Sequence, residues 1–240
     1  MSVSHPGSHT SHLLLPIEAL AFWARNQLAF WIAAFPIAVL AGALAYFLPA
    51  DEWASAPLFT IVYALFLDRW QKIALLDGAP ICEEADALRR MMITTRFLLL
   101  AIGAYALALL TMAVPVIDVL LWCMVLSPIL LLLPALSAGD SITLGEAWRL
   151  GRPVQLVLLI IILATALLSI CAQHGAIWLA TLLPQKAWTP LVTAGLVRLV
   201  DCLLLAVAGH MLASLYRSLS GWQPPEPEDR PYRATRRRSS

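Results

Sequence analysis

The feature that most constrains this chain is a helix-start signal followed at once by a long apolar run. Thr143 and Glu146 have the spacing of a capping box, in which each residue accepts a hydrogen bond from the other's backbone N–H. Gly151-Arg152-Pro153 then predicts a bend, because proline cannot continue a hydrogen-bonded helix. The apolar run from 154 to 171 and its edges give about 20 residues, enough to cross a hydrocarbon core of about 30 Å. The stretch therefore predicts a surface helix that leads into a transmembrane helix.

Composition extends this interpretation to the whole chain. Hydrophobic residues make up 60% of the sequence and charged residues 13%, against about 25% charged in soluble domains. We predict an all-α polytopic membrane bundle with interfacial amphipathic helices and about six transmembrane spans, near 28–48, 53–67 (continuing as one helix to 76), 97–114, 119–136, 154–173 and 192–216. A further outer surface helix is expected over 176–183, and His174 is expected at the end of the fifth span.

The chain divides into a membrane domain, residues 17–220, between two tails. Residues 1–16 are predicted to be a disordered tail, of which 1–12 are Ser/His-rich and lack the basic start of a cleaved signal peptide. Residues 221–240 are proline-rich and basic, which predicts disorder. The four cysteines form no CxxC pair, so we expect no metal site, no disulfide framework and no cofactor.

Charge asymmetry predicts the orientation. With both termini in the cytoplasm, 14 of the 16 basic residues lie in inner segments, whereas Lys186 alone lies in an outer turn and Arg198 lies in the sixth span. This is the positive-inside bias of multi-pass membrane proteins. Trp148, Arg149 and Arg152 suit the headgroup level and are candidate interfacial anchors, so the expected partners are anionic lipid at the cytoplasmic face and other membrane proteins. The basic C-terminal tail is assigned to lipid rather than to nucleic acid.

The sequence around 18–20, 86–88 and 146–148 starts three similar segments, each an acidic residue followed by alanine and a large apolar residue. Two interpretations remain open: three copies of a surface helix followed by a two-span hairpin, or a basic lead-in that every hairpin needs.

Small residues predict close helix packing at Ala34, Ala38 and Gly42, which recur every four residues, and at the isolated Gly103 and Gly209. Asp68 and Lys72 are spaced i,i+4 and should pair where the second helix emerges at the inner surface.

Arg198 and Asp201 are the candidate intramembrane pair. They are three residues apart and therefore share a helix face. Gly195, Cys202 and Gly209 lie on nearly the same face, so the pair should look into the bundle, which lowers the cost of charges in a membrane. The pair either locks the sixth span to its neighbours or has a binding or proton-coupled role.

Two stretches carry a resemblance to known proteins. Residues 67–77, Leu-Asp-Arg-Trp-Gln-Lys-Ile-Ala-Leu-Leu-Asp, and Leu133-Pro134-Ala135 followed by 141–152 resemble segments of uncharacterised six-span bacterial inner-membrane proteins. These are similar to the membrane domain found beside some glycerophosphodiester phosphodiesterases. The resemblance implies a bacterial inner-membrane setting and supplies no catalytic residues.

The chain carries none of the GxSxG, HExxH, P-loop or dinucleotide-binding motifs. The first expectation for function is therefore a non-enzymatic scaffold or assembly factor. The alternative is a small transporter or permease that uses Arg198 and Asp201.

Overall fold

The computed structural model of this chain describes residues 14–47, 52–76, 127–140, 142–182 and 188–223, together with 95–96, 99 and 102–103. Every regular element in these ranges is a helix, which agrees with the predicted all-α class. The elements are α1 (Leu15–Arg25), α2 (Gln27–Phe47), α3 (Glu52–Leu75), α6 (Ser127–Ile129), α7 (Leu132–Ala138), α8 (Leu144–Gly151), the 3-10 turn η2 (Arg152–Val154), α9 (Gln155–Leu182) and α10 (Thr189–Ser220). The tails 1–13 and 224–240 lie outside the described residues, and α1 begins two residues before the predicted domain start.

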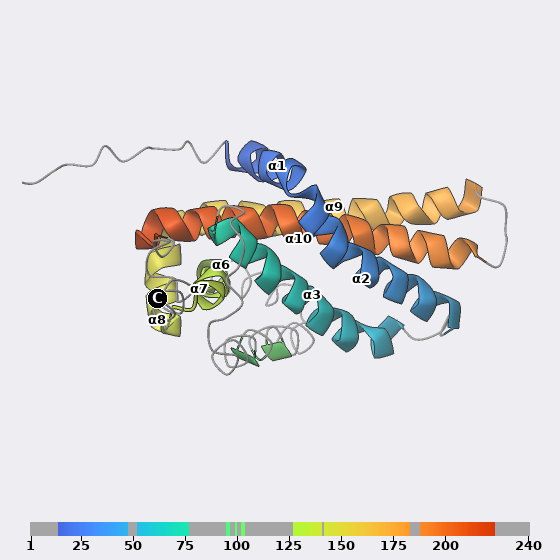
Figure 1. The fold of residues 1–240 in the computed structure, drawn as a ribbon, viewed down its shortest axis with the longest axis horizontal. Helices are drawn as coiled ribbons and strands as arrows, with labels where there is room; N and C mark the ends of the chain where they lie inside the picture. Colours follow the sequence, from blue (N-terminus) through green and yellow to red (C-terminus); the bar gives the residue numbers. More distant parts are fainter. Residues whose placement is uncertain are drawn as a thin grey trace, which may run out of the picture.

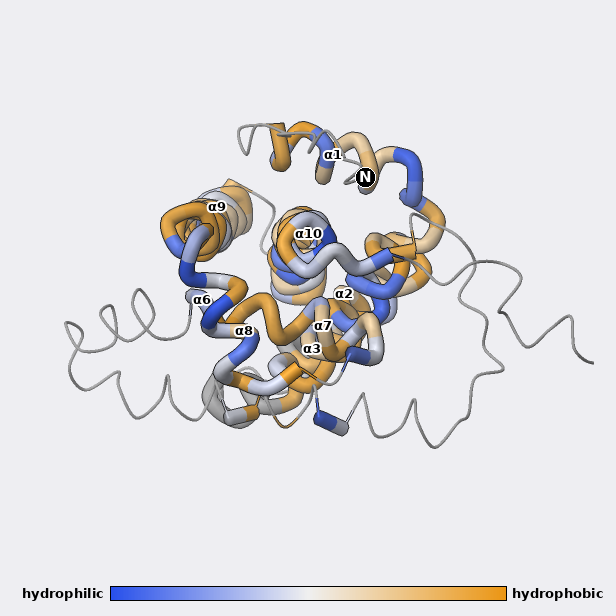
Figure 2. The backbone as a smooth tube through the Cα atoms, turned by 90° about the vertical axis from the view of Figure 1, so that its left-hand side faces the viewer, coloured by the Kyte–Doolittle hydropathy of each residue, from blue (hydrophilic) through white to orange (hydrophobic). Residues whose placement is uncertain are grey.

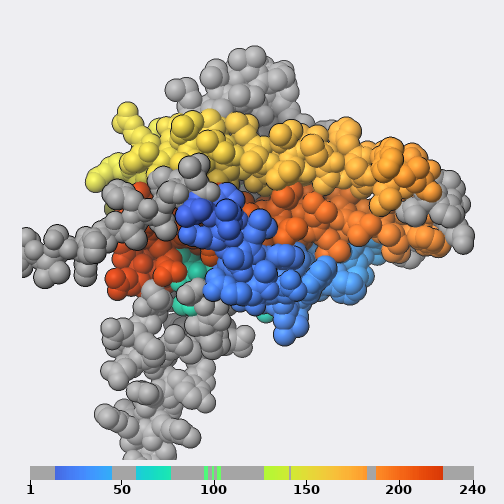
Figure 3. Space-filling model, turned by 90° about the horizontal axis from the view of Figure 1, so that it is seen from above, coloured from blue at the N-terminus to red at the C-terminus, as the bar shows by residue number. Residues whose placement is uncertain are grey.

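Helix α10 is the centre of the bundle. It packs against α2, α9, α3 and α1, and the end-on view shows it surrounded by these helices (Figure 2). Helices α9 and α10 run side by side, whereas α2 and α3 cross them obliquely (Figure 1). In the space-filling view α10 is visible as a strip between α9 and the α1–α2 segment (Figure 3).

Three stretches among the described residues are long and apolar enough to cross a membrane: Gln27–Leu44 in α2, Leu144–Leu182 from α8 through α9, and Thr189–Ser220 in α10. Helix α3 forms a single 24-residue helix from Glu52 to Leu75, as predicted for the second span and its extension. The predicted third span, 97–114, lies almost entirely outside the described residues.

The small-residue face of α2 packs as predicted. Ala34 is fully buried, and a Cβ added to Gly42 would lie 2.8 Å from the backbone oxygen of Leu191 at the start of α10. On the facing helix, a Cβ on Gly195 would lie 3.2 Å from the carbonyl oxygen of Ala38. Glycine and alanine therefore allow the two backbones to approach closely.

The same expectation holds for Gly209. A Cβ on Gly209 would lie 2.7 Å from a terminal methyl of Leu67 on α3, so this glycine brings α3 against α10. Among the residues that the structure describes, none lies within 4 Å of a Cβ on Gly103. The spacing of glycines along a helix does not show which of them are packed, because that depends on whether another helix lies against them.

Helix α1 contains the segment 18–20, which one of the two interpretations of the sequence assigned to a surface helix. Pro16 stands in its first turn, where the missing N–H costs nothing. Leu15, Ala19 and Phe22 form its buried stripe with i,i+4,i+7 spacing. Phe22 stacks on His210 of α10 with ring centroids 4.4 Å apart, so α1 lies against the bundle rather than crossing it.

The predicted fourth span, 119–136, is described only from residue 127 onward, and this part is not one regular helix. Residues 127–138 form two short helices, α6 and α7, interrupted at Leu130 and Leu131. Pro134 has no N–H to donate to the carbonyl of Leu130, and that carbonyl accepts from Leu133 instead, at 3.1 Å. Gly139, with φ 81°, then ends α7 in the left-handed conformation.

The helix end predicted near 173–175 is wrong. Helix α9 continues without a break to Leu182, so no separate helix forms over 176–182, and His174 lies within α9. Gly175 weakens a helix by only about 1 kcal/mol relative to alanine. The His174 ring nitrogen Nδ1 lies 2.9 Å from the carbonyl oxygen of Ile170, so its polar group is accommodated along the helix.

The predicted capping box and bend before α9 are confirmed. Glu146 N–H donates to the Thr143 hydroxyl at 3.3 Å, and Thr143 N–H donates to the Glu146 carboxylate at 2.6 Å. The Thr143 N–H, together with the Thr143 hydroxyl at 2.9 Å, holds the pKa of the exposed Glu146 carboxyl below its ordinary value of 4.5, because both donate to the charged form. The turn η2 then joins α8 to α9, and α8 points away from the α9 axis (Figure 1).

Candidate functional site

The predicted intramembrane pair forms. Arg198 Nη1 donates to Asp201 Oδ2 at 3.1 Å, one turn along α10. The two partners differ in exposure: the side chain of Arg198 is 32% exposed and that of Asp201 is 9% exposed. The carboxylate therefore looks into the bundle, as the small-residue face predicted, while the guanidinium reaches toward its edge.

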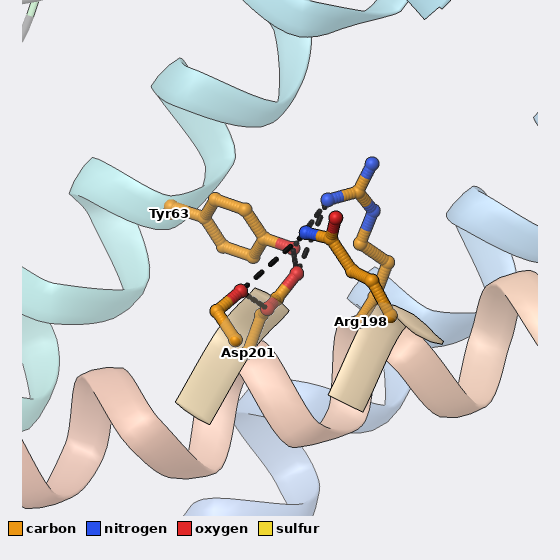
Figure 4. Close-up of polar contacts among 5 residues, drawn as sticks. Tyr63, Arg198 and Asp201 are labelled. Atoms are coloured by element: carbon orange, nitrogen blue, oxygen red, sulfur yellow. Dashed lines mark hydrogen bonds and ion pairs between the residues drawn. The ribbon is translucent and has the colours of Figure 1, made fainter. Parts of the chain in front are cut away.

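Two hydroxyls from neighbouring helices complete the site around Asp201. Tyr63 of α3 donates to Oδ2 at 3.1 Å, and Ser169 of α9 donates to Oδ1 at 2.7 Å. Arg198 Nη1 also lies 3.4 Å from the Tyr63 hydroxyl oxygen. Figure 4 shows Tyr63 and Arg198 converging on the carboxylate of Asp201. The carboxylate thus holds together three helices that are distant in sequence.

The guanidinium of Arg198 has a second, apolar neighbour. Its central carbon lies 4.5 Å from the centroid of the Phe59 ring, one helical turn before Tyr63 on α3. This is within the range of a cation–π contact. Two residues of α3, Phe59 and Tyr63, therefore position the Arg198 side chain, and Asp201 compensates its charge.

A cavity of about 480 Å³ opens beside this cluster between α3, α9 and α10. Its polar end is formed by Tyr63, Ser169, Gln173, Arg198 and Asp201, and Gln173 Nε2 lies 3.5 Å from the Ser169 hydroxyl. Apart from Thr165, the remaining walls are small or aliphatic, formed by Leu67, Leu130, Leu133, Ile161, Ile162, Ala166, Leu204, Leu205, Ala208, Gly209 and Leu212.

Sequence reasoning missed Tyr63, Ser169 and Gln173. Polar residues inside apolar runs were the available signal, since such residues in spans usually face the bundle. The signal does not give the partner, because Tyr63 and Asp201 are 138 positions apart. Only the packing of α3 and α9 on α10 brings these side chains together.

A second polar cluster surrounds Asp68 on α3. The predicted pair with Lys72 is confirmed at 2.6 Å, and Asp68 is only 5% exposed. Ser137 of α7 covers it, with its hydroxyl 2.8 Å from Asp68 Oδ1 and 3.2 Å from Gln71 Oε1. The sequence did not indicate this contact, because Ser137 and Asp68 are 69 positions apart.

The candidate interfacial anchors lie apart from both clusters. Trp148 is half-buried and Arg149 is exposed on α8, and Arg152 is exposed in the turn that follows. Helix α8 lies at the end of the bundle where α10 ends (Figure 1). Their interfacial role stays a prediction.

No group of side chains in the described ranges could hold a metal ion. Of the two cysteines in these ranges, Cys202 is buried beside Asp201 and Cys171 is exposed. Cys82 and Cys123 lie outside the described residues.

No protein-family model matches this sequence, and no curated protein or solved structure matches it significantly. The resemblance noted for its two basic stretches therefore remains an expectation.

Proposed function

We propose that this chain is a multi-pass protein of the bacterial inner membrane with six spans and both termini in the cytoplasm. The three stretches of membrane-spanning length and the concentration of basic residues in the predicted inner segments support this topology. The resemblance of residues 67–77 to inner-membrane proteins points to the same setting.

Fusions to alkaline phosphatase test the topology, because the enzyme is active only outside the cytoplasm. Fusions after Trp53 and Lys186 should be active, and fusions after Arg90 and Tyr232 inactive. Activity after Arg90 would mean that α3 does not cross the membrane, and the six-span topology would then be wrong.

We further propose that the protein acts as a non-enzymatic scaffold or assembly factor. The observation that carries this proposal is the set of three hydrogen bonds to the Asp201 carboxylate. This carboxylate accepts hydrogen bonds from three helices at once, which suits a lock that holds a bundle in one arrangement. A rigid bundle is what a scaffold requires.

The outer face of α9 supplies the surface that such a scaffold would present. Exposed apolar residues follow one another at intervals of four and three, the spacing with which one helix packs against another. They are Leu156, Ile160, Leu163, Leu167, Ile170 and Ile177, with His174 at the one intervening polar position. We call this set the α9 seam.

Site-specific photo-crosslinking in cells tests the scaffold proposal. A photoreactive amino acid at Leu163, on the α9 seam, should give an adduct with a discrete membrane protein. Leu168 is the matched control, because it is also exposed on α9 but lies about 140° around the helix from Leu163. Lipid adducts alone at both positions would contradict the proposal.

A small transporter or permease is the second candidate, favoured by the cavity beside Arg198 and Asp201. Proteoliposomes containing the purified protein should then show saturable uptake of protons or small solutes. Loss of this uptake in a folded Asp201→Asn variant would favour transport. Absence of uptake for every solute tested would leave the scaffold as the better account.

A further inference from the structure

We propose that the cavity between α3, α9 and α10 binds one single-chain lipid whose head group is uncharged and carries hydroxyls, as in a monoacylglycerol. The inference does not depend on whether the protein is a scaffold or a permease, because it concerns the occupant of the cavity alone. It rests on the shape of the cavity, the distribution of its polar groups and the charge balance at its polar end.

The cavity is long and narrow. Its lining residues extend from Arg198 to Leu212 on α10 and from Ile161 to Gln173 on α9, which corresponds to about 18–21 Å of helix at about 1.5 Å per residue. Its volume of about 480 Å³ lies within the usual range of small-molecule sites. Spread over that length, the volume leaves room for one extended chain rather than for a fused ring system or a two-chain lipid.

The polar and apolar walls are separated along this length. Leu67, Leu130, Leu133, Ile161 and Leu212 line the part of the cavity remote from the pair, and they offer no hydrogen-bonding side chain. Thr165 lies between the two ends, but its hydroxyl already donates to the carbonyl of Ile161 at 2.7 Å. An occupant therefore needs an apolar tail and a single polar end.

The polar end has unused donors and acceptors. The hydrogen bonds described for Arg198 use Nη1 alone, and a guanidinium carries five N–H donors on three nitrogens. Gln173 donates through Nε2 to Ser169, and its carbonyl oxygen is available as an acceptor. A hydroxyl both donates and accepts, so a hydroxylated head group can use both residues.

Charge balance excludes an ionic head group. Arg198 and Asp201 lie 3.1 Å apart and neutralise each other. A carboxylate or phosphate head would add an uncompensated charge next to the buried Asp201 carboxylate, and burying an unpaired charge is costly. The site therefore favours a neutral glycerol head over a fatty acid anion or an anionic phospholipid.

Photolabelling of the full-length purified protein in detergent tests the proposal. The probe is a monoacylglycerol with a diazirine in its acyl chain, and labelled peptides are identified by mass spectrometry. We expect saturable labelling on the cavity faces of α9 and α10, displaced by unlabelled monoolein at least tenfold more effectively than by oleate at pH 9 or by phosphatidylglycerol. Equal displacement by oleate or phosphatidylglycerol would overturn the assignment of a neutral head group.

A pair of matched variants locates the site. Ala166→Phe places a ring in the cavity and should reduce labelling at least tenfold, whereas Ala164→Phe makes the same change on the opposite side of α9, outside the lining, and should not. Both alanines are exposed in the structure, so neither ring displaces buried side chains. Gln173→Leu should weaken monoolein competition about two- to tenfold, the effect of one hydrogen bond.

Non-saturable labelling, or equal labelling of the two phenylalanine variants, would show that the probe reports only the surrounding lipid and would overturn the proposal. The competition experiment uses the unchanged protein, so the proposal remains testable if a variant does not fold.

Discussion

Replacing Arg198 by alanine should destabilise the protein more than replacing Asp201 by asparagine. The first change leaves a carboxylate that is 9% exposed with only the Tyr63 and Ser169 hydroxyls as donors. Breaking a buried ion pair by removing one partner costs about 3–5 kcal/mol. We expect the lower end, about 3 kcal/mol, because Arg198 lies near the edge of the bundle and solvent or detergent headgroups can compensate in part.

Asp201→Asn removes the negative charge and leaves no buried carboxylate without its cationic partner. An asparagine at position 201 can still accept from a hydroxyl, and Arg198 keeps its contact with Phe59 and its 32% exposure. The expected cost is about 1.5 kcal/mol, the lower end of the range for a lost hydrogen bond to a charged group.

Thermal unfolding in detergent, followed by size-exclusion chromatography of heated samples, measures the difference. For a chain of this size, about 1 kcal/mol corresponds to about 2–4 °C in the midpoint. Arg198→Ala should therefore lower the midpoint by about 6–12 °C and Asp201→Asn by about 3–6 °C. Arg152→Ala is the control, since Arg152 is exposed and its removal should change little. A larger decrease in the midpoint for Asp201→Asn than for Arg198→Ala would refute the argument that an unpaired buried carboxylate is the more costly outcome.

The double swap Arg198→Asp with Asp201→Arg sharpens this test. From the sequence alone the swap should restore much of the stability, because the pair is retained. The structure predicts only partial recovery, since Tyr63 and Ser169 direct their hydroxyls at position 201 and Phe59 lies against the guanidinium at position 198. Full recovery would mean that the hydroxyls and the ring contribute nothing. A swapped protein that folds normally but loses a cellular activity would make the pair a functional site rather than a lock.

Two further predictions concern the helices around the pair. Gly42→Ala should lower the unfolding midpoint markedly, because the added Cβ would lie 2.8 Å from the backbone oxygen of Leu191. Gly175→Ala should leave the midpoint unchanged or raise it, since none of the described residues lies within 4 Å of its Cβ and alanine favours helix. An equal decrease in the unfolding midpoint of both variants would contradict the close approach of α2 and α10. The N-terminal turn of α8 should fray in acid. The folded-state pKa of Glu146 lies below its ordinary value of 4.5. The stabilisation of this turn by the Glu146 carboxylate is therefore complete above about pH 4.5 and is lost as the pH falls through the lowered pKa. A spin label in the first turn of α8 should gain mobility over that range, and Glu146→Gln should abolish the pH dependence; an unchanged transition in that variant would assign it to another group.

Local features of this protein could be read from the sequence because their partners are near in the chain. The capping box at Thr143 and Glu146, the pair Asp68–Lys72 and the pair Arg198–Asp201 all involve residues three or four positions apart. Helix geometry alone brings such residues together. The apolar content of α2, α9 and α10 likewise predicted helices of membrane-spanning length, with boundaries that differ from the observed ones by a few residues except at the end of α9.

Contacts between distant segments could be decided only by the tertiary structure. Asp201 receives hydroxyls from Tyr63 and Ser169, and Asp68 is buried because Ser137 of α7 lies over it. The interruption between α6 and α7 and the continuation of α9 past Gly175 depend on whether the bonds lost at a proline or glycine are replaced locally. In an apolar bundle nearly every helix face is hydrophobic, so periodicity does not indicate which face meets which helix. The packing of α3 and α9 around α10 made that choice, and with it formed the polar cluster and the cavity beside it.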